Sequence, residues 1–103
     1  MKHAHDIVFI DKACLKEYES LSDNQKLLID KGVARLRVRA NELGKPLSGD
    51  LSGCKELKYR SDGLRIIFRI KENKIEIVEI IAIGKRDKDK VFKSAKMHIA
   101  RNI

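Results

Sequence analysis

Four residues in the second half of this chain have side chains suited to chemistry on a phosphodiester. The catalytic candidates are Lys58, Arg65, Arg86 and Glu56. Cleavage of RNA by its own 2′-hydroxyl needs in-line positioning, proton transfer and neutralisation of charge on the phosphorane, and positioning and electrostatics usually carry most of the rate. Arginine suits the neutralising role because its planar guanidinium binds phosphate in a bidentate way. These residue types therefore indicate a site that grips a phosphate group.

Other cations in the same stretch would follow a nucleic-acid backbone as point charges, with an effect that falls as salt rises. Structural roles are also open for these residues. Lys58 and Arg60 could be solvent-facing strand residues that pair with Glu56. Arg65 could pair across strands with Glu56 or Glu79. The candidate RNA-binding cations are Lys55, Arg60, Lys85, Lys88 and Lys90.

The charge of the chain is uneven along its length. The 103 residues carry 23 Lys and Arg against 15 Asp and Glu, a formal net charge of +8. Residues 1–50 contribute a net charge of +1 and residues 51–103 a net charge of +7. A positive field of this kind points to nucleic acid, an acidic protein or an anionic membrane surface, although it can also serve solubility alone.

Composition narrows the class of protein further. No apolar run approaches the ~18 residues of a transmembrane helix, and the first residues lack the apolar core of a signal peptide. Cys14 and Cys54 show no CxxC spacing, so we expect reduced, buried thiols and a cytoplasmic protein. Asp87 and Asp89 have no histidine or third carboxylate nearby in sequence, so we expect neither a metal nor a small-molecule cofactor.

The first half of the sequence predicts one strand followed by two helices. Residues 5–10 have the β-branched and aromatic composition of a strand. Asp11 can N-cap a short helix that runs through about Ser20. A capping box over Ser22–Gln25 begins a second helix, expected over 23–43. Its apolar stripe consists of Ile29, Val33, Leu36, Ala40 and Leu43.

The second half shows an apolar period of two, which predicts strands. Turns are expected at 61–63 and 72–73. Residues 75–83 are apolar on both faces and are therefore expected to form a central strand. Residues 85–90 read as a charged loop, in which Arg86 could simply be solvated.

These elements predict a single α+β domain over residues 1–103, in the order β-α-α-β-β-β-α. We expect a small antiparallel sheet of about four strands with the two N-terminal helices on one face. The first strand joins at an edge or beside the central strand, and a short last helix covers about 89–101. The other face of the sheet stays partly open. The polar residues expected on it are Glu56, Lys58, Arg60, Arg65 and Arg69.

The ordered set of motifs over residues 51–92 resembles the RelE/ParE superfamily of bacterial toxins from toxin–antitoxin pairs, on the RelE side. The motifs are Leu51-Ser-Gly53, Glu56-Leu-Lys58, Arg60-Ser-Asp-Gly63, Arg65-Ile-Ile-Phe68, Ile83-Gly-Lys-Arg86 and Val91-Phe92. The resemblance implies the fold described above and a cytoplasmic ribonuclease that cuts mRNA in the ribosomal A site without a metal.

The resemblance also implies individual roles. Lys58 matches a basic residue that activates the 2′-hydroxyl, and Arg65 matches the arginine that stabilises the phosphate. Arg86 matches the arginine that assists the leaving oxygen. Phe92 stands where many members place a tyrosine that stacks on a base, although it could equally be a core contact of the last helix. Glu56 replaces a lysine of the best-known pattern, so either Glu56 or Lys58 could be the general base.

Two other functions stay open at this point. The ParE branch of the superfamily has the same fold and poisons DNA gyrase without nuclease activity. A degenerate toxin would only bind its antitoxin. In every case the resemblance implies a cognate antitoxin protein as partner, and an acidic segment of it would suit the basic half of the chain. For the ribonuclease, the further partners are the ribosome and mRNA.

Overall fold

The computed structural model describes residues 5–59, 63–71 and 77–102. Strand β1 (Asp6–Phe9) is followed by helices α1 (Lys12–Glu19) and α2 (Asp23–Arg39). A two-residue strand, β2 (Lys45–Pro46), and a 3-10 helix, η1 (Gly49–Leu51), lead to β3 (Lys55–Tyr59), β4 (Leu64–Lys71) and β5 (Ile77–Lys85). A second 3-10 helix, η2 (Asp87–Asp89), precedes α3 (Lys90–Arg101). The predicted α+β class is confirmed.

The sheet is mixed, with five strands in the order β1-β5-β4-β3-β2. The meander β3-β4-β5 is antiparallel as predicted, whereas β1 pairs with β5 in parallel. The prediction of about four antiparallel strands is therefore corrected in two details. Strand β2 is too short to show an alternating pattern, and the parallel pairing of β1 depends on a crossover through α1 and α2 that no local signal encodes.

Helices α1 and α2 begin where their N-capping residues predict. Asp11 accepts a hydrogen bond from the Cys14 amide at 2.9 Å, and Ser22 and Gln25 form both arms of the capping box. Helix α2 ends at Arg39, before the predicted residue 43. The chain continues in a turn, in which the Glu42 and Leu43 amides both donate to the Arg39 carbonyl and Leu43 lies in the core. The apolar stripe of α2 faces the sheet as expected.

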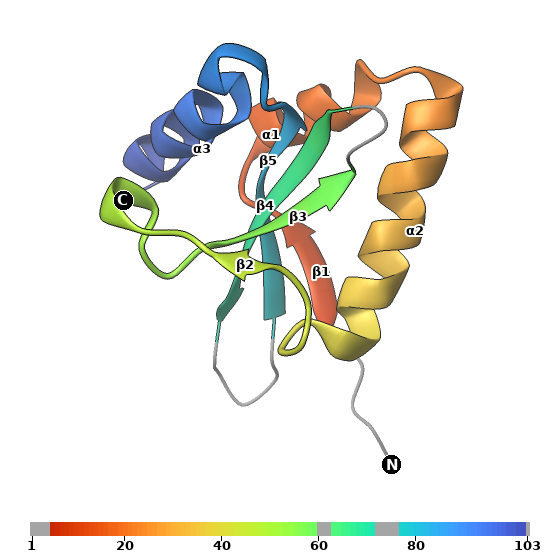
Figure 1. Ribbon diagram of the computed structural model, residues 1–103, viewed down its shortest axis with the longest axis horizontal. Coiled ribbons are helices and arrows are strands. Elements are labelled where there is room, and N and C mark those ends of the chain that lie inside the picture. The colour runs from red at the N-terminus through yellow and green to blue at the C-terminus, as the bar shows by residue number, and fades with distance from the viewer. Residues whose placement is uncertain (1–4, 60–62, 72–76, 103) are drawn as a thin grey trace.

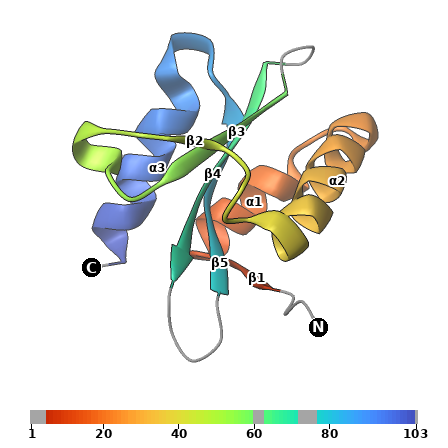
Figure 2. The ribbon, with the colours of Figure 1, turned by 60° about the horizontal axis from the view of Figure 1, so that its bottom comes forward.

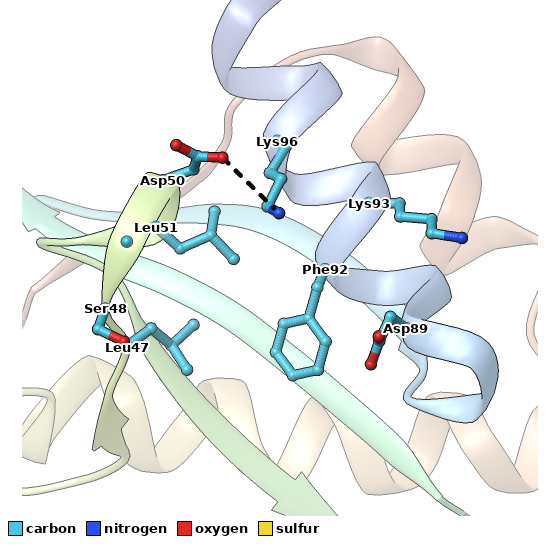
Figure 3. Close-up of a pocket in the computed structure, with 9 residues that line it drawn as sticks. Leu47, Ser48, Asp50, Leu51, Asp89, Phe92, Lys93 and Lys96 are labelled. Carbon is cyan, nitrogen blue, oxygen red and sulfur yellow. Dashed lines mark ion pairs between the residues drawn. The ribbon is translucent and has the colours of Figure 1, made fainter.

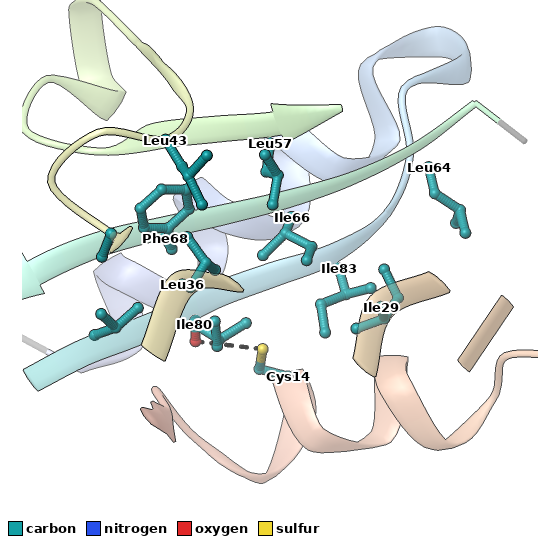
Figure 4. Packing of buried hydrophobic residues seen from close by; sticks show 12 residues of the cluster. Cys14, Ile29, Leu36, Leu43, Leu57, Leu64, Ile66, Phe68, Ile80 and Ile83 are labelled. Atoms are coloured by element: carbon teal, nitrogen blue, oxygen red, sulfur yellow. Dashed lines mark hydrogen bonds between the residues drawn. The ribbon is translucent and has the colours of Figure 1, made fainter. Parts of the chain in front are cut away.

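The sheet separates two apolar clusters, with α1 and α2 on one side of it and α3 on the other (Figures 1 and 2). On one side α1 and α2 cover Leu64, Ile66 and Phe68 of β4, as Figure 4 shows for the larger cluster. On the other side α3 packs on β5 and β4, and its Val91 and Ala95 are buried there. The face that was expected to be partly open is thus closed at its centre by α3.

Strand β5 lies between β1 and β4 and is buried on both faces, as predicted for residues 77–83, although β4 is the middle strand of the five. Residues 75 and 76, the turn at 72–73, Arg60 and most of the turn at 61–63 lie outside the described residues. Among the described helices, none combines the length and apolar character needed to span a membrane.

A candidate phosphate-binding site beside the last helix

The register of β3 and β4 brings three of the four catalytic candidates to one face of the sheet. Lys58 lies opposite Arg65, and Glu56 lies opposite Ile67. Side chains of paired residues project from the same face, so all of these lie on the side covered by α3. Arg65 is also opposite Gly84 of β5, which has no side chain to cover the guanidinium.

Glu56 is the centre of this cluster. Its side chain is 5% exposed, its Oε2 lies 3.5 Å from Arg65 Nε, and its Oε1 lies 3.8 Å from Lys58 Nζ. Arg65 is 12% exposed and Lys58 is 36% exposed, so the lysine is the group that reaches solvent. The alternative pairing of Arg65 with Glu79 does not form, because Glu79 binds Arg69 at 2.6 Å.

The contact between Glu56 and Arg65 is an ion pair without a hydrogen bond. Neither Glu56 Oε2 nor Arg65 Nε has a hydrogen-bond partner among the described residues, although both atoms are buried. Arg65 Nη1 donates to the Leu64 carbonyl at 3.1 Å, which holds one side of the guanidinium. The two atoms face each other across 3.5 Å, so the buried carboxylate holds the guanidinium by charge and leaves its other nitrogens for further contacts.

Arg86 directly follows the end of β5 that lies beside Arg65. Its backbone amide donates to the Gly63 carbonyl at 3.1 Å, which ties the end of β5 to the turn two residues before Arg65. The Arg86 side chain is exposed. Lys88 and Asp89, which follow it, have φ values of 52° and 59°. The chain therefore turns sharply between Arg86 and the start of α3.

The remaining RNA-binding candidates are dispersed. Lys55 lies on the opposite face, where its ammonium contacts the carbonyls of Ala40 and Asn41 at 3.4 and 3.3 Å, at the end of α2. This contact complements the helix dipole. Lys85 is exposed and paired with Leu64, so it also projects from the face opposite Arg65. The candidates Lys88 and Lys90 are exposed near the start of α3, and Arg60 is outside the described residues.

The described part of the chain contains no group of three His, Cys, Asp or Glu side chains placed to hold a metal ion. Cys14 and Cys54 are both buried and free, as expected. Burial raises the pKa of each thiol, and the nearby carboxylates of Glu17 and Asp11 raise that of Cys14 further. Both cysteines are therefore neutral core residues and take no part in the site.

No family model matches the chain. A curated relative, the mRNA interferase toxin RelE of Escherichia coli K12, is 29% identical over 90 residues, which is 82% of this chain and 87% of the relative. The solved structure of an E. coli toxin RelE mutant in the free state has a TM-score of 0.71 at 25% identity, covering 97% of this chain and 99% of that one. A chain of the intact E. coli RelBE toxin–antitoxin complex has a TM-score of 0.59 at 29% identity, covering 80% and 96%.

The chain is similar in sequence and fold to RelE toxins of toxin–antitoxin systems. The resemblance drawn from the motifs is thereby confirmed. The resemblance implied that Phe92 stacks on a base, and a core contact of the last helix was the alternative. The structure places Phe92 half-buried against the α3 cluster, and it also lines a pocket.

That pocket, of about 530 Å³, separates η1 from α3 and was missed in the sequence (Figure 3). Its wall opposite Phe92 comes from residues 47–51, of which only Leu51 belonged to a recognised motif. Lys45 was missed as well. It is opposite Glu56 across β2 and β3, so this exposed lysine shares the face of Arg65. The two-residue length of β2 left no pattern from which to find it.

Proposed function

We propose that this RelE-like toxin is an endoribonuclease that cleaves mRNA in the ribosomal A site by attack of a 2′-hydroxyl on the adjacent phosphate, with no metal ion in the mechanism. The observation that carries the proposal is the cluster of Glu56, Lys58 and Arg65. It offers a guanidinium and an ammonium on a rigid sheet, both held by the buried carboxylate of Glu56. The curated relative, an mRNA interferase, supports the same activity.

Arg65 is proposed to hold the scissile phosphate. Its side chain is largely buried and braced by the Leu64 carbonyl, so little conformational entropy is lost when it binds an anion. A preorganised cation of this kind stabilises charge that develops on the phosphorane. Arg86 starts from the neighbouring strand end and is exposed, so it can approach the leaving oxygen from the same corner of the sheet.

Lys58 and Glu56 have different access to a substrate. Glu56 is 5% exposed and lies beneath two cations, whereas Lys58 is 36% exposed. A group that moves a proton must come within hydrogen-bonding distance of it, directly or through one water. We therefore assign the contact with the 2′-hydroxyl to Lys58, and the orientation of Lys58 and Arg65 to Glu56.

The gyrase-poison alternative is not favoured, because the relatives and neighbours described above are RelE proteins. A cognate antitoxin is the expected protein partner, as RelB is for RelE in the solved complex. An acidic antitoxin segment would complement the +7 charge of residues 51–103. Cleavage of translated mRNA on ribosomes places the proposed activity in the cytoplasm.

Controlled expression in a bacterium tests the proposal. Wild type is compared with Arg65→Ala and Arg86→Ala, while growth is followed and a reporter mRNA is examined by primer extension. Arg39→Ala is the matched control, because Arg39 is an exposed arginine at the end of α2 that pairs with its neighbour Glu42. We expect growth arrest and new 5′ ends within translated codons for wild type and Arg39→Ala, and loss of both in the two site variants.

Two results would contradict the proposal. Arrest with intact mRNA and double-strand DNA breaks would return the toxin to the gyrase-poison class. Cleavage that survives both arginine substitutions would exclude the site. Within the site, Lys58→Ala should lower the cleavage rate by about 10²–10⁴-fold, the usual contribution of a proton-transfer group. Glu56→Gln should lower it less, because it loosens the cations without removing either one.

A further inference from the structure

Glu17 of α1 connects two elements that carry site residues. Its Oε1 accepts a hydrogen bond from the Ile83 amide of β5 at 3.1 Å, and its Oε2 lies 3.0 Å from His98 Nε2 of α3. We infer that Glu17 is a positioning residue for cleavage: it fixes the end of β5 and α3 relative to one another, and thereby Arg86 and Phe92. The inference rests on the proposed function.

The Ile83 contact takes the place of a missing strand. Strand β1 pairs with β5 only as far as Phe9 and Ile80, and a last bond joins the Ile10 amide to the Ile80 carbonyl. Beyond that point β5 has no described strand on this side. The buried Ile83 amide would lack a partner there, and a buried unpaired amide is costly. The carboxylate of Glu17 supplies the acceptor.

The His98 contact ends in a buried polar network. His98 is 4% exposed, and the charged groups that face it are Glu17, Asp11 and Arg101. Its Nδ1 lies 3.3 Å from Arg101 Nη2 and 3.8 Å from Asp11 Oδ2. Asn102 donates to both Asp11 Oδ2 and the His98 carbonyl, at 2.9 and 2.7 Å. A fully connected network of this kind rigidifies the elements that it joins.

Both ends of the Glu17 bridge are close to candidate site residues. Ile83 precedes Arg86 by three residues, and His98 follows Phe92 by six residues, about 9 Å along one helix. Between them, Gly84 of β5 lies against Val91 of α3: a Cβ at Gly84 would lie 3.7 Å from Val91 Cβ, an ordinary van der Waals distance. A rotation of α3 would therefore move Phe92 relative to Arg65 and Arg86. A displacement of about 1 Å at a reacting centre can cost about a hundredfold in rate.

The test compares two substitutions of similar size. In Glu17→Gln, the amide oxygen can still accept from Ile83. The amide nitrogen can donate to His98 Nε2 once Nδ1 carries the imidazole proton and turns from Arg101 to Asp11 Oδ2. Glu17→Met fills the same space but makes neither contact. Tyr18→Phe is the control on the same helix, because it removes the Tyr18–Asp30 hydrogen bond, which lies apart from the site. Cleavage of translated mRNA is measured below the unfolding temperature of every variant, together with hydrogen exchange of β5 and α3.

We expect cleavage by Glu17→Met to fall about tenfold or more, with faster exchange at Ile83 and through α3. Glu17→Gln and Tyr18→Phe should stay within about threefold of wild type. If wild type cleaves mRNA and a folded Glu17→Met variant cleaves it equally fast, this inference is overturned and the proposed function is not. Equal losses in the Met and Gln variants would also overturn it, because charge and not positioning would then be responsible. A wild type that cleaves no mRNA would overturn the proposed function and this inference with it.

Discussion

A glycine inside α2 makes room for a tyrosine of the sheet. A Cβ at Gly32 would lie 1.8 Å from Tyr59 Oη, 3.0 Å from Tyr59 Cζ and 3.3 Å from Ile66 Cδ1. The first distance is far below any van der Waals contact, so Gly32→Ala requires the Tyr59 side chain to move. Tyr59 follows Lys58 on β3, so the contact also fixes the strand end that carries this site lysine.

The expected cost follows from two opposing effects. Alanine is favoured over glycine by about 1 kcal/mol inside a helix. Overpacking a well-packed contact costs about 1–3 kcal/mol, and displacement of the tyrosine ring exposes apolar surface as well. The steric effect should win, with a net loss of about 1–2 kcal/mol, which lowers Tm by roughly 5–15 °C for a domain of this size.

A double-mutant cycle with Tyr59→Phe tests the cause. Tyr59 Oη is buried and has no hydrogen-bond partner among the described residues, so its removal alone should cost little. Without Oη, the nearest contact of the alanine Cβ becomes the ring carbon at 3.0 Å, which a small shift can relieve. Gly32→Ala should therefore cost less in the Tyr59→Phe background, with a coupling free energy of about 1 kcal/mol from urea unfolding.

Ala34→Gly is the control, because Ala34 lies on the same helix outside the buried core and reports helix propensity. It should cost about 1 kcal/mol. If Gly32→Ala is at least as stable as wild type while Ala34→Gly behaves normally, the steric argument is refuted. If Gly32→Ala costs the same with and without the tyrosine hydroxyl, the Tyr59 contact is not its cause.

Two further predictions concern titratable groups of the core. Burial by itself raises the pKa of Asp11, but hydrogen bonds from the Cys14 amide and Asn102, with nearby His98 and Arg101, outweigh it and hold that pKa below its ordinary value. The ionised carboxylate therefore stabilises the fold at neutral pH, and this stabilisation is lost as the pH falls through the lowered pKa. In urea unfolding, Asp11→Asn should lower the free energy of unfolding at pH 7 and change it little near pH 2. Since burial raises the pKa of the Cys14 and Cys54 thiols, both should react with a thiol reagent at pH 8 only as fast as the fold opens; two equivalents of immediate reaction would contradict their burial.

Local signals were sufficient for most elements of the fold. Asp11 and the capping box at Ser22 and Gln25 marked the starts of α1 and α2, and both caps form. The alternation along β4 separated Leu64, Ile66 and Phe68 from Arg65, and these residues do face opposite sides. Caps and alternation are encoded within a few residues, so no tertiary information was needed.

The candidate site was predictable only in part, because its geometry depends on contacts between distant segments. The cluster of Glu56, Lys58 and Arg65 could be expected from one hairpin. The Glu17–His98 contact joins residues 81 positions apart, and neither residue stood in a recognised motif. Lys55 directly precedes Glu56 on the strand and therefore points to the other face of the sheet. Its contact with the end of α2 depends on where that helix packs, which the local sequence does not encode.

An irregularity in β5 explains how one face serves both α3 and the cations. The pairing of β4 and β5 shifts register between Ile67 and Phe68, so Ile81 is an extra residue on β5. A bulge of this kind reverses the faces of all residues that follow it. Because of it, Ile81 and Ala82 both join the cluster under α3, and Gly84 instead of Ile83 comes to lie beside Arg65. With regular pairing, an isoleucine side chain would stand next to the guanidinium, and α3 could not approach the strand as closely. The bulge therefore keeps the proposed phosphate site open while the helix next to it stays packed.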